Sequence, residues 1–582
     1  MTSNDHEIMA VLRAGKRCYE AHPYIAALCG ARREAFTGSV GGYLTTLVNY
    51  PESHVNTQVG WLPTMLANRG MPRWLMEARH SPRSIVLSRY YRGELPELRR
   101  QSIGPDLVFS RLWTETGCRE VLAGLLGDRQ FGFEVERAVY MTVLHRLMVS
   151  GSDRHANDWQ RKFHIPGAES LTLDHTYKAM AWLGEMLPGP KAGDGRPLTD
   201  AIEEALYRYR QPLFGDLSVA FFDTNSLYFE GQGGESLGQR GHSKDYRPQL
   251  NQVVLGIVLD QHDRPIASFL LPGNTADVTT LLPVVHRLNE RFGITKACVV
   301  ADRGMISAET IAGLEAAGVD YILGARERST KEVYETVMTT AAAAVPLAIP
   351  RQKGATELEI KDVSVEGRRY IVCYNEEEAK KDAEVRAQIL AGLTVKLAGG
   401  DKSLVSNKGY RRYIKASKGK AFAIDPAKIE ADARFDGLFI LRTNSKISAL
   451  QVVLRYRNLL AVEDTFKTAK ARLTTRPIHH KTDAGIRGHV FCSFLALVLR
   501  AELVRRLAPQ RPKDIEWLQI VDDLADLSVV DVEQDGKRCR LRTAPGATVD
   551  AVCRAVGITL PPVYQEIPPA KPVAVTPESC GA

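Results

Sequence analysis

The spacing of apolar and polar positions changes several times along the chain. Between Leu95 and Tyr209 apolar residues recur mostly at every third or fourth position, which is typical of amphipathic helices. From Leu217 onward, short β-branched and apolar runs predict buried strands. After Glu327 the segments alternate between apolar and polar residues, and a helical period returns at Leu454. We therefore expect a mainly helical region, then an α/β core that a β-rich insertion interrupts.

Five apolar runs between Leu217 and Ala325 predict the strands of one mixed sheet. The first three are joined in hairpin fashion and the last two alternate with helices, which is the order of an RNase H-like fold. In that topology the first and fourth strands are neighbours. Asp223 ends the first run and Asp302 the fourth, so we expect their carboxylates side by side. The runs are residues 217–223, 252–260, 265–271, 296–302 and 319–325, with helices within 277–292 and over 307–317.

A glycine-rich stretch, residues 231–248, joins the first two predicted strands. It has neither the spacing of a dinucleotide-binding fingerprint nor that of a P-loop. We predict a flexible hairpin connection that presents His242, Lys244 and Arg247.

The segment Leu454–Leu473 has the period of a single helix. On such a helix Tyr456, Glu463, Lys467 and Lys470 would share one face. A carboxylate, two lysines and a tyrosine on one face suit a phosphodiester. The alternative is that Glu463 and Lys467 form an ordinary surface ion pair.

Further elements are predicted around this helix. The insertion contains alternating segments and one charged helix, and a strongly apolar helix follows Leu473. The last elements are a helix, a hairpin that turns at Asp535-Gly536, and a second helix. The segments are strands at 358–365, 369–375, 420–425 and 437–444, helices at 376–398 and 486–507, and the helix–hairpin–helix region within 513–560.

Composition narrows the class of protein. The 582 residues are 44% hydrophobic and carry a net charge of +8, which fits a nucleic-acid partner but also many other enzymes. The nine cysteines form no C-x-x-C pair, which favours a reducing compartment and argues against a structural zinc site. We find no signal peptide and no apolar run of about 20 residues, so we expect a soluble cytoplasmic protein.

Asp223, Asp302 and Glu463 are the candidate catalytic residues. Three converging carboxylates repel one another unless cations neutralise them, and oxygen ligands favour Mg²⁺ or Mn²⁺ over zinc. Two such ions about 4 Å apart support in-line phosphoryl transfer. The alternative is that the aspartates only form turns.

Several segments together resemble a known family: FDTNSLYFE, GHSKDYRP, LPGNTAD, VVADRGMIS, GLFILRTN, YRNLLAVEDTFKTAK and RPIHHKTDAGIRGHVFCSFLAL. From about Leu95 to Ile520 the chain resembles the bacterial insertion-sequence DDE transposases of the cut-and-paste class. These carry a Y-(2)-R-(3)-E-(6)-K signature and form an IS-four-like group.

The resemblance implies that Asp223, Asp302 and Glu463 hold two Mg²⁺ ions, or Mn²⁺ in their place. It implies that Tyr456 and Lys470 grip the phosphate beside the scissile bond, with help from Lys467. The arginine position of the signature holds Leu459, and Arg455 or Arg457 would have to compensate.

Basic segments then become candidate DNA contacts. Residues 403–422 contain six basic residues with Tyr410 and Tyr413 among them, a composition that suits phosphates and an unstacked base or, alternatively, a solvated loop. Relatives stack an aromatic of the insertion on a flipped base. No tryptophan lies between Asp302 and Glu463, so a tyrosine or phenylalanine would serve. The predicted DNA contacts are Tyr456, Lys467, Lys470, Arg303, Arg411, Arg412 and Lys415, and the basic segment 465–481 continues from the glutamate.

The resemblance predicts a DDE transposase that acts as a homodimer on double-stranded DNA in the bacterial cytoplasm, with no membrane partner. It would cut at the terminal inverted repeats of its element and join the ends to target DNA. Two alternatives stay open: a nuclease without strand transfer, and a catalytically silent DNA-binding relative. The regions are 1–93, of uncertain role; 94–215, helical, for DNA binding and dimerisation; 216–326 and 446–510, the two parts of the RNase H-like core; 327–445, the insertion; 511–560, helix–hairpin–helix; and 561–582, a disordered proline-rich tail.

Overall fold

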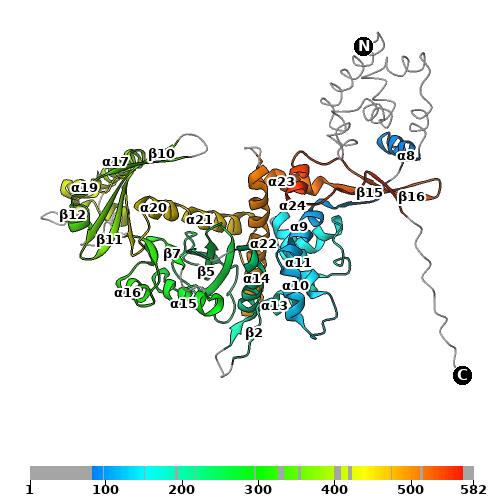
Figure 1. The fold of residues 1–582 in the computed structure, drawn as a ribbon, viewed down its shortest axis with the longest axis horizontal. Coiled ribbons are helices and arrows are strands. Elements are labelled where there is room, and N and C mark those ends of the chain that lie inside the picture. The colour runs from blue at the N-terminus through cyan, green and yellow to red at the C-terminus, as the bar shows by residue number, and fades with distance from the viewer. Residues whose placement is uncertain are drawn as a thin grey trace, which may run out of the picture. The chain divides into compact units, whose positions relative to one another are not determined.

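The computed structural model describes residues 82–95, 97–149, 151–189, 195–214, 217–293, 297–325, 333–350, 355–398, 408–416, 422–473, 475–510 and 515–567. They fall into two compact units, each considered by itself (Figure 1). The first unit takes the chain to residue 180, residues 472–474 and the chain from 495; the second takes 181–471 and 475–494.

The first unit combines helices with a four-stranded antiparallel sheet in the order β1-β15-β16-β17. The pairing of β1 with β15 joins residues 97–102 to residues 528–532, which the hydrophobic pattern does not predict. The predicted helix–hairpin–helix order is confirmed, with positive φ at Asp535 and Gly536 in the turn. The elements are α8 (Pro82–Tyr91), β1 (Glu97–Ser102), α9 (Gly104–Glu115), α10 (Cys118–Leu126), α11 (Val135–Met148), α12 (Asp153–Trp159), α23 (Trp517–Asp526), β15 (Ser528–Gln534), β16 (Lys537–Arg542), α24 (Val549–Val556) and β17 (Tyr564–Glu566), while α13 (Leu173–Leu183) and α22 (Asp483–Leu507) belong partly to each unit.

The second unit is built on a nine-stranded mixed sheet in the order β6-β5-β4-β7-β8-β14-β11-β10-β9. β4 pairs in parallel with β7, which confirms that the first and fourth predicted strands are neighbours. The elements are β2 (Met186–Leu187), β3 (Arg196–Pro197), α14 (Leu198–Phe214), β4 (Val219–Tyr228), β5 (Gln252–Asp260), β6 (Pro265–Pro272), α15 (Leu281–Phe292), β7 (Cys298–Ala301), α16 (Ala308–Ala316), β8 (Tyr321–Gly324), β9 (Val345–Pro350), β10 (Ala355–Val365), β11 (Arg368–Tyr374), α17 (Glu376–Ala398), α18 (Lys408–Arg411), β12 (Ile414–Ala416), β13 (Phe422–Ile424), α19 (Pro426–Ala433), β14 (Leu438–Thr443), α20 (Ala449–Arg457) and α21 (Leu459–Lys467).

The strands of the predicted insertion extend the same sheet. β14 pairs with β8 and β11 pairs with β14, both antiparallel, and β10 and β9 continue outward. The core sheet is therefore larger than the five strands that we expected. The charged helix is confirmed as α17.

The two faces of the sheet are covered by different helices, with α15 and α16 on one side and α20 and α21 on the other (Figure 1). Ala220 and Phe222 of β4 pack into the same apolar cluster as Leu288 of α15 and Leu314 of α16. Because side chains alternate along a strand, Asp223 faces the side of α20 and α21.

Two predicted elements have different bounds in the structure. β4 continues to Tyr228, so Asp223 lies within the strand and not at its end. The predicted single helix Leu454–Leu473 is two helices that meet at Asn458 and a π-helical turn, Thr468–Arg472. The break follows the packing, since α20 contacts β7 and β8 whereas α21 contacts β4 and β5. The four residues of the predicted face therefore do not lie along one continuous helix.

Other expectations concern the termini and the surface. Residues 1–81, residues 403–407 and 417–421 of the basic segment, and the tail from residue 568 lie outside the described residues. None of the described helices combines the length and apolar character needed to cross a lipid bilayer. The six cysteines in the described ranges are buried and form no disulfide with one another: Cys118, Cys298, Cys373, Cys492, Cys539 and Cys553.

Candidate active site

The register of β4 against β7 brings two carboxylates together. Residues Val219–Phe222 pair one to one with Cys298–Ala301, and Asp223 and Asp302 each follow the last pair. Neighbouring strands lie about 4.8 Å apart. The two aspartates therefore follow the same paired position, with Asp223 within β4 and Asp302 directly after the end of β7.

The surroundings of Asp223 disfavour its charge. Burial is the largest cause and raises the pKa of Asp223 to about 6, and the nearby carboxylates of Asp302 and Asp277 raise it further. Lys244 and the backbone N–H of Thr224, 2.7 Å from Oδ1, act in the opposite direction. A half-buried carboxylate that repels its neighbours is a good place for an added cation.

Tyr456 of α20 orients the second aspartate. Its hydroxyl donates to Oδ1 of Asp302 over 3.2 Å, and its ring lies nearly parallel to that of Phe439 on β14, with centroids 6.5 Å apart. A Cβ atom at Gly324 would lie 2.6 Å from this hydroxyl, so β8 needs glycine there. Tyr456 thus contacts a carboxylate in this structure, and its contact with phosphate stays a prediction.

Glu463 lies on α21, the helix that packs against β4. Leu459, Val462 and Phe466 bury one face of α21, and Glu463 is exposed at the flank of that face. Among the described residues its side chain forms no hydrogen bond or ion pair. The helix is in the right place for a third carboxylate, and the convergence of Glu463 on the aspartates stays a prediction.

The lysine at the end of this segment, Lys470, is tied to β4. Nζ of Lys470 lies 2.6 Å from Oδ1 of Asn225 and 2.7 Å from Oδ1 of Asp245, and its side chain is only 9% exposed. Asn225 is two residues beyond Asp223 and therefore on the same face of β4. Burial lowers the pKa of Lys470, and Asp245 opposes that shift. Lys470 thus links the π-helical turn after α21 to the strand beside Asp223.

Both lysines that were predicted to bind phosphate have a carboxylate partner in the structure. Lys467 is exposed and pairs with Asp464 over 3.2 Å, a pair that contributes little at the surface. Lys470 pairs with Asp245. A phosphate could take the place of the first partner more easily than of the second, which is buried.

A second group of polar residues braces β4 from its opposite face. Nζ of Lys244 donates to the carbonyl of Thr224 over 2.6 Å and lies 3.2 Å from Oδ2 of Asp277. The hydroxyl of Thr224 donates to Oδ1 of Asp277 over 2.7 Å. The sequence signal was present in GHSKDYRP and LPGNTAD, but nothing in either segment alone indicates that they meet behind Asp223.

The residues around the signature arginine position do not supply an obvious substitute. Leu459 is 7% exposed and belongs to the core. Arg455 interacts with the Cys298 side chain on β7, and Nη1 of Arg457 is buried without a hydrogen-bond partner among the described residues. Compensation by either arginine stays a prediction.

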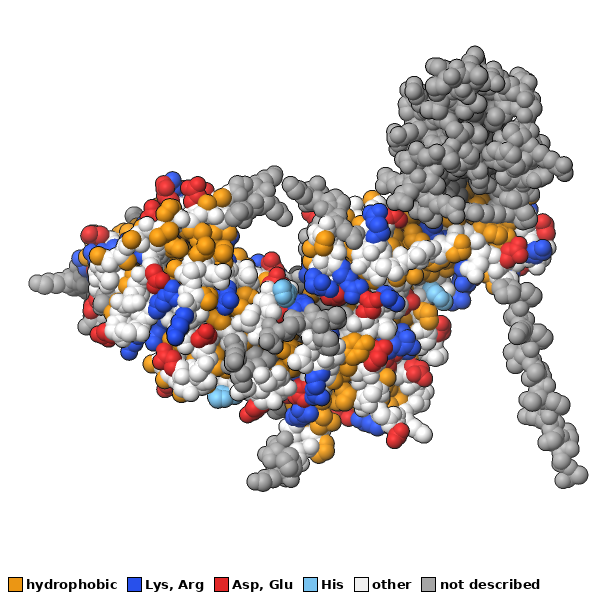
Figure 2. All heavy atoms as spheres, viewed as in Figure 1, with side chains coloured by type: hydrophobic (Ala, Val, Ile, Leu, Met, Phe, Trp, Pro, Cys, Tyr) orange, Lys and Arg blue, Asp and Glu red, His pale blue; other side chains and the backbone are white. Residues whose placement is uncertain are grey.

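The aromatic residues of the basic segment are less available than expected. Tyr413 is fully buried and its hydroxyl donates to Oδ2 of Asp432 over 2.6 Å, so its ring is not exposed for stacking on a base in this structure. The tyrosine closes the small core beneath β12. Arg411, Arg412 and Lys415 are exposed, as is Arg303 directly after Asp302. Figure 2 shows lysine and arginine side chains scattered among acidic ones, and these four stay predicted DNA contacts.

The oxygen ligands of the three candidate catalytic residues suit a hard divalent cation such as Mg²⁺. Asp223, Asp302 and Glu463 offer only carboxylate oxygens, the ligands that Mg²⁺ and Mn²⁺ prefer. The mutual repulsion recorded in the raised pKa of Asp223 would be relieved by a positive charge between the aspartates.

Residues 215–499 match the family model of the transposase DDE domain. The match includes all three candidate catalytic residues and supports a DDE transposase, an enzyme that cleaves and transposes DNA. No curated protein is similar enough to count as a match. Among solved structures, a piggyBac transposase synaptic complex with hairpin DNA aligns with 72% of this chain and 78% of its own at 9% identity and a TM-score of 0.30. A likeness that weak shows neither fold nor function.

Proposed function

We propose that this chain is the transposase of a bacterial insertion sequence, which cuts double-stranded DNA at the terminal inverted repeats and joins the ends to target DNA. The observation that carries the proposal is the register that pairs Phe222 with Ala301, so that Asp223 and Asp302 each follow the last pair, with the helix of Glu463 packed on β4. The order of the first five strands, with β5 antiparallel to β4 and β6, β7 and β8 parallel to it, supports an RNase H-like core.

The chemistry has two steps. In the first, the oxygen of water attacks phosphorus at the end of the element, and the 3′ bridging oxygen leaves as a hydroxyl. In the second, that 3′-hydroxyl attacks a target phosphodiester and displaces another 3′ oxygen. Both steps need a nucleophile without its proton and a leaving oxygen whose charge is stabilised, which two bound Mg²⁺ ions would supply.

The residues of the chain have distinct roles in this proposal. Asp223, Asp302 and Glu463 would hold the ions. Tyr456 would fix the rotamer of Asp302, and Lys470 would fix β4 relative to α21 through Asn225. The exposed Lys467 would contact a phosphate, as predicted, and the protein would act as a homodimer.

The test is strand cleavage and joining with Mg²⁺ on DNA that carries the inverted repeats flanking the gene. Asp223→Asn, Asp302→Asn and Glu463→Gln should each abolish both steps. Matched controls are Asp464→Asn, an exposed neighbour of Glu463, and Asp320→Asn, exposed just before β8 at the opposite end of the parallel strands. Undiminished cleavage in any of the three variants would remove that residue from the active site.

The same assay separates the two alternatives. Cleavage without joined product would identify a nuclease. Mg²⁺-independent binding to the repeats with no cleavage by the unaltered protein would identify a silent DNA-binding relative.

A further inference from the structure

The loop between β4 and β5 holds one aromatic ring almost wholly in solvent. Tyr246 is 94% exposed, and its backbone has φ 58°, in the left-handed region that residues with a Cβ atom avoid. A tyrosine in that conformation and in water gains no packing from the fold. Its presence therefore calls for a role outside the folded chain.

The residues before Tyr246 are firmly anchored. The backbone N–H of Lys244 donates to Oγ of Ser226 over 2.9 Å. The side chain of Asp245 is 8% exposed, and its Oδ1 lies 2.7 Å from Nζ of Lys470. Its Oδ2 lies 3.1 Å from Nη1 of Arg476, which makes an ion pair but not a hydrogen bond. The tyrosine ring is thus presented on a fixed backbone, and its exposure is not that of a loose loop.

Two arginines lie over one ring beside this loop. Cζ of Arg247 lies 4.8 Å and Cζ of Arg476 5.6 Å from the ring centroid of Tyr228. The exposed guanidinium of Arg247 forms no ion pair or side-chain hydrogen bond with any described residue. Stacking fixes the plane of a guanidinium and leaves its N–H edge free for a bidentate phosphate contact.

These residues lie within reach of a strand cut at the aspartates. Tyr228 follows Asp223 by five residues on β4, or roughly 17 Å at 3.3 Å per residue, and by alternation its side chain leaves the opposite face of the strand. Arg476 is linked to the face of Asp223 through its ion pair with Asp245, which also binds Lys470. That is about five base-pair steps of B-DNA. Cleavage leaves a terminal base with one uncovered face, for which an exposed aromatic ring is a suitable partner.

We propose that Tyr246, Arg247 and Arg476 form a subsite for the cleaved DNA strand. The two arginines bind phosphates within about five steps of the scissile bond, and Tyr246 stacks on the terminal base. The subsite rests on the proposed function, since it takes DNA as the partner.

The test measures DNA binding without metal, so that it does not depend on cleavage. The probe is a short blunt duplex with 2-aminopurine, whose fluorescence falls on stacking, as its terminal base. Tyr246→Ala should weaken binding about 5- to 100-fold and remove the quenching, while Tyr246→Phe retains both. Arg247→Ala should lower the slope of log K against log salt by about 0.9, the value for one phosphate.

Two controls separate a built subsite from general charge and from misfolding. Arg240→Ala removes an exposed arginine from the same loop that does not stack on Tyr228, and it should leave the slope unchanged. Tyr246→Gly suits the observed φ and should not lower Tm while it abolishes quenching. A change of oligomeric state in Tyr246→Ala with the quenching intact would assign the ring to a protein contact and overturn the proposal.

The outcomes are distinct from those of the cleavage assay. An equal decrease of the salt slope in Arg240→Ala and Arg247→Ala would overturn the subsite, even in a protein that cleaves DNA normally. Wild-type quenching of 2-aminopurine in Tyr246→Ala would also overturn it. If the variants change the quenching and the salt slope as expected but the protein never cleaves DNA, the subsite is supported and the transposase function is rejected.

Discussion

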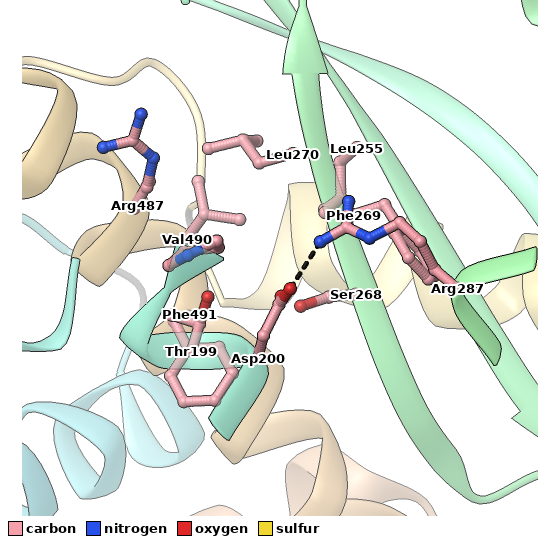
Figure 3. A pocket seen from close by; sticks show the side chains of 11 residues that line it. Thr199, Asp200, Leu255, Ser268, Phe269, Leu270, Arg287, Arg487, Val490 and Phe491 are labelled. Atoms are coloured by element: carbon pink, nitrogen blue, oxygen red, sulfur yellow. Dashed lines mark hydrogen bonds and ion pairs between the residues drawn. The ribbon is translucent and has the colours of Figure 1, made fainter. Parts of the chain in front are cut away.

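Two clusters of carboxylates in the second unit are balanced in opposite ways. On α14, Asp200, Glu203 and Glu204 all meet Arg291 of α15, with nitrogen–oxygen distances of 3.4, 2.8 and 3.1 Å. Figure 3 shows a second arginine, Arg287, pointing at Asp200. Each of these carboxylates has its own cation within the fold.

The carboxylates around Asp223 have too few cations of the fold beside them. The nearby ammonium, Lys244, is engaged with Asp277 and the carbonyl of Thr224, and Asp302 accepts from the neutral hydroxyl of Tyr456. Burial raises the pKa of Glu203, to about 7, as it does that of Asp223, so desolvation alone does not separate the clusters. The difference is the supply of positive charge. The first cluster is complete as folded, and we propose that cations from outside complete the second.

The largest expected effect breaks the matched cluster. Arg291→Met should lower the free energy of unfolding by about 3–5 kcal/mol, because it leaves buried carboxylates without their cation. Chemical denaturation measures this. Arg208→Ala is the control, since Arg208 is 69% exposed and touches only the edge of the cluster. A loss below 1 kcal/mol would show that the arginine does not hold the cluster together.

Asp223→Asn should have the opposite effect on stability and should also reduce cleavage. Cleavage should fall by more than about 100-fold, since even outer partners of metal ligands cost 10- to 100-fold when removed. Stability at neutral pH should rise, because a disfavoured charge is gone. Initial rates and Tm on the same preparation test this. Loss of both activity and stability would place Asp223 among structural residues.

The pH dependence of stability sharpens the contrast. The pKa of Asp223 is raised in the folded state from 3.8 to about 6, so its stabilising contribution is present below pH 3.8 and is lost as pH rises through 6. The difference amounts to roughly 1–3 kcal/mol. Wild type should therefore lose more stability than Asp223→Asn between these pH values. The pKa of Glu203 is raised in both proteins, so its contribution cancels when their stabilities are compared.

Mg²⁺ should reverse that loss in the wild type. Its addition at neutral pH should raise Tm, chelation should restore the lower value, and Asp223→Asn should not respond. A response equal in both proteins would place the ion elsewhere.

Tyr456→Phe should have an intermediate effect. It removes the hydroxyl that contacts Asp302 but keeps the ring that stacks on Phe439. Cleavage should fall about 10-fold, and stability by about 1 kcal/mol or less. Unchanged cleavage together with weaker DNA binding would support the phosphate contact predicted from sequence in place of the aspartate contact.

The smallest effect belongs to Lys467→Ala. Its exposed pair with Asp464 should contribute less than about 0.5 kcal/mol to stability. Binding to DNA should lose about one phosphate contact in a salt series. A wild-type salt slope would mean that Lys467 does not touch the DNA backbone.

Sequence pattern predicts the parts of the site that depend on local runs of residues. Asp223 and Asp302 are predictable because each ends an apolar run, and the order of the strands then predicts that they lie side by side. The contacts of Lys470 were not predictable in this way, because Asp245 lies 225 residues before it and no local pattern indicates the pair. The break at Asn458 was also missed, since no proline or glycine marks it and the two helices separate only by packing on different strands.

The pairing of β14 with β8 limits how this protein can be shortened. An insertion of more than one hundred residues invites deletion to obtain a minimal catalytic unit. Such a deletion would remove β14 and leave the backbone N–H and C=O groups of β8 along an open sheet edge. Open edges recruit strands from other molecules. The trimmed protein is therefore expected to aggregate unless polar or charged residues are introduced to protect β8.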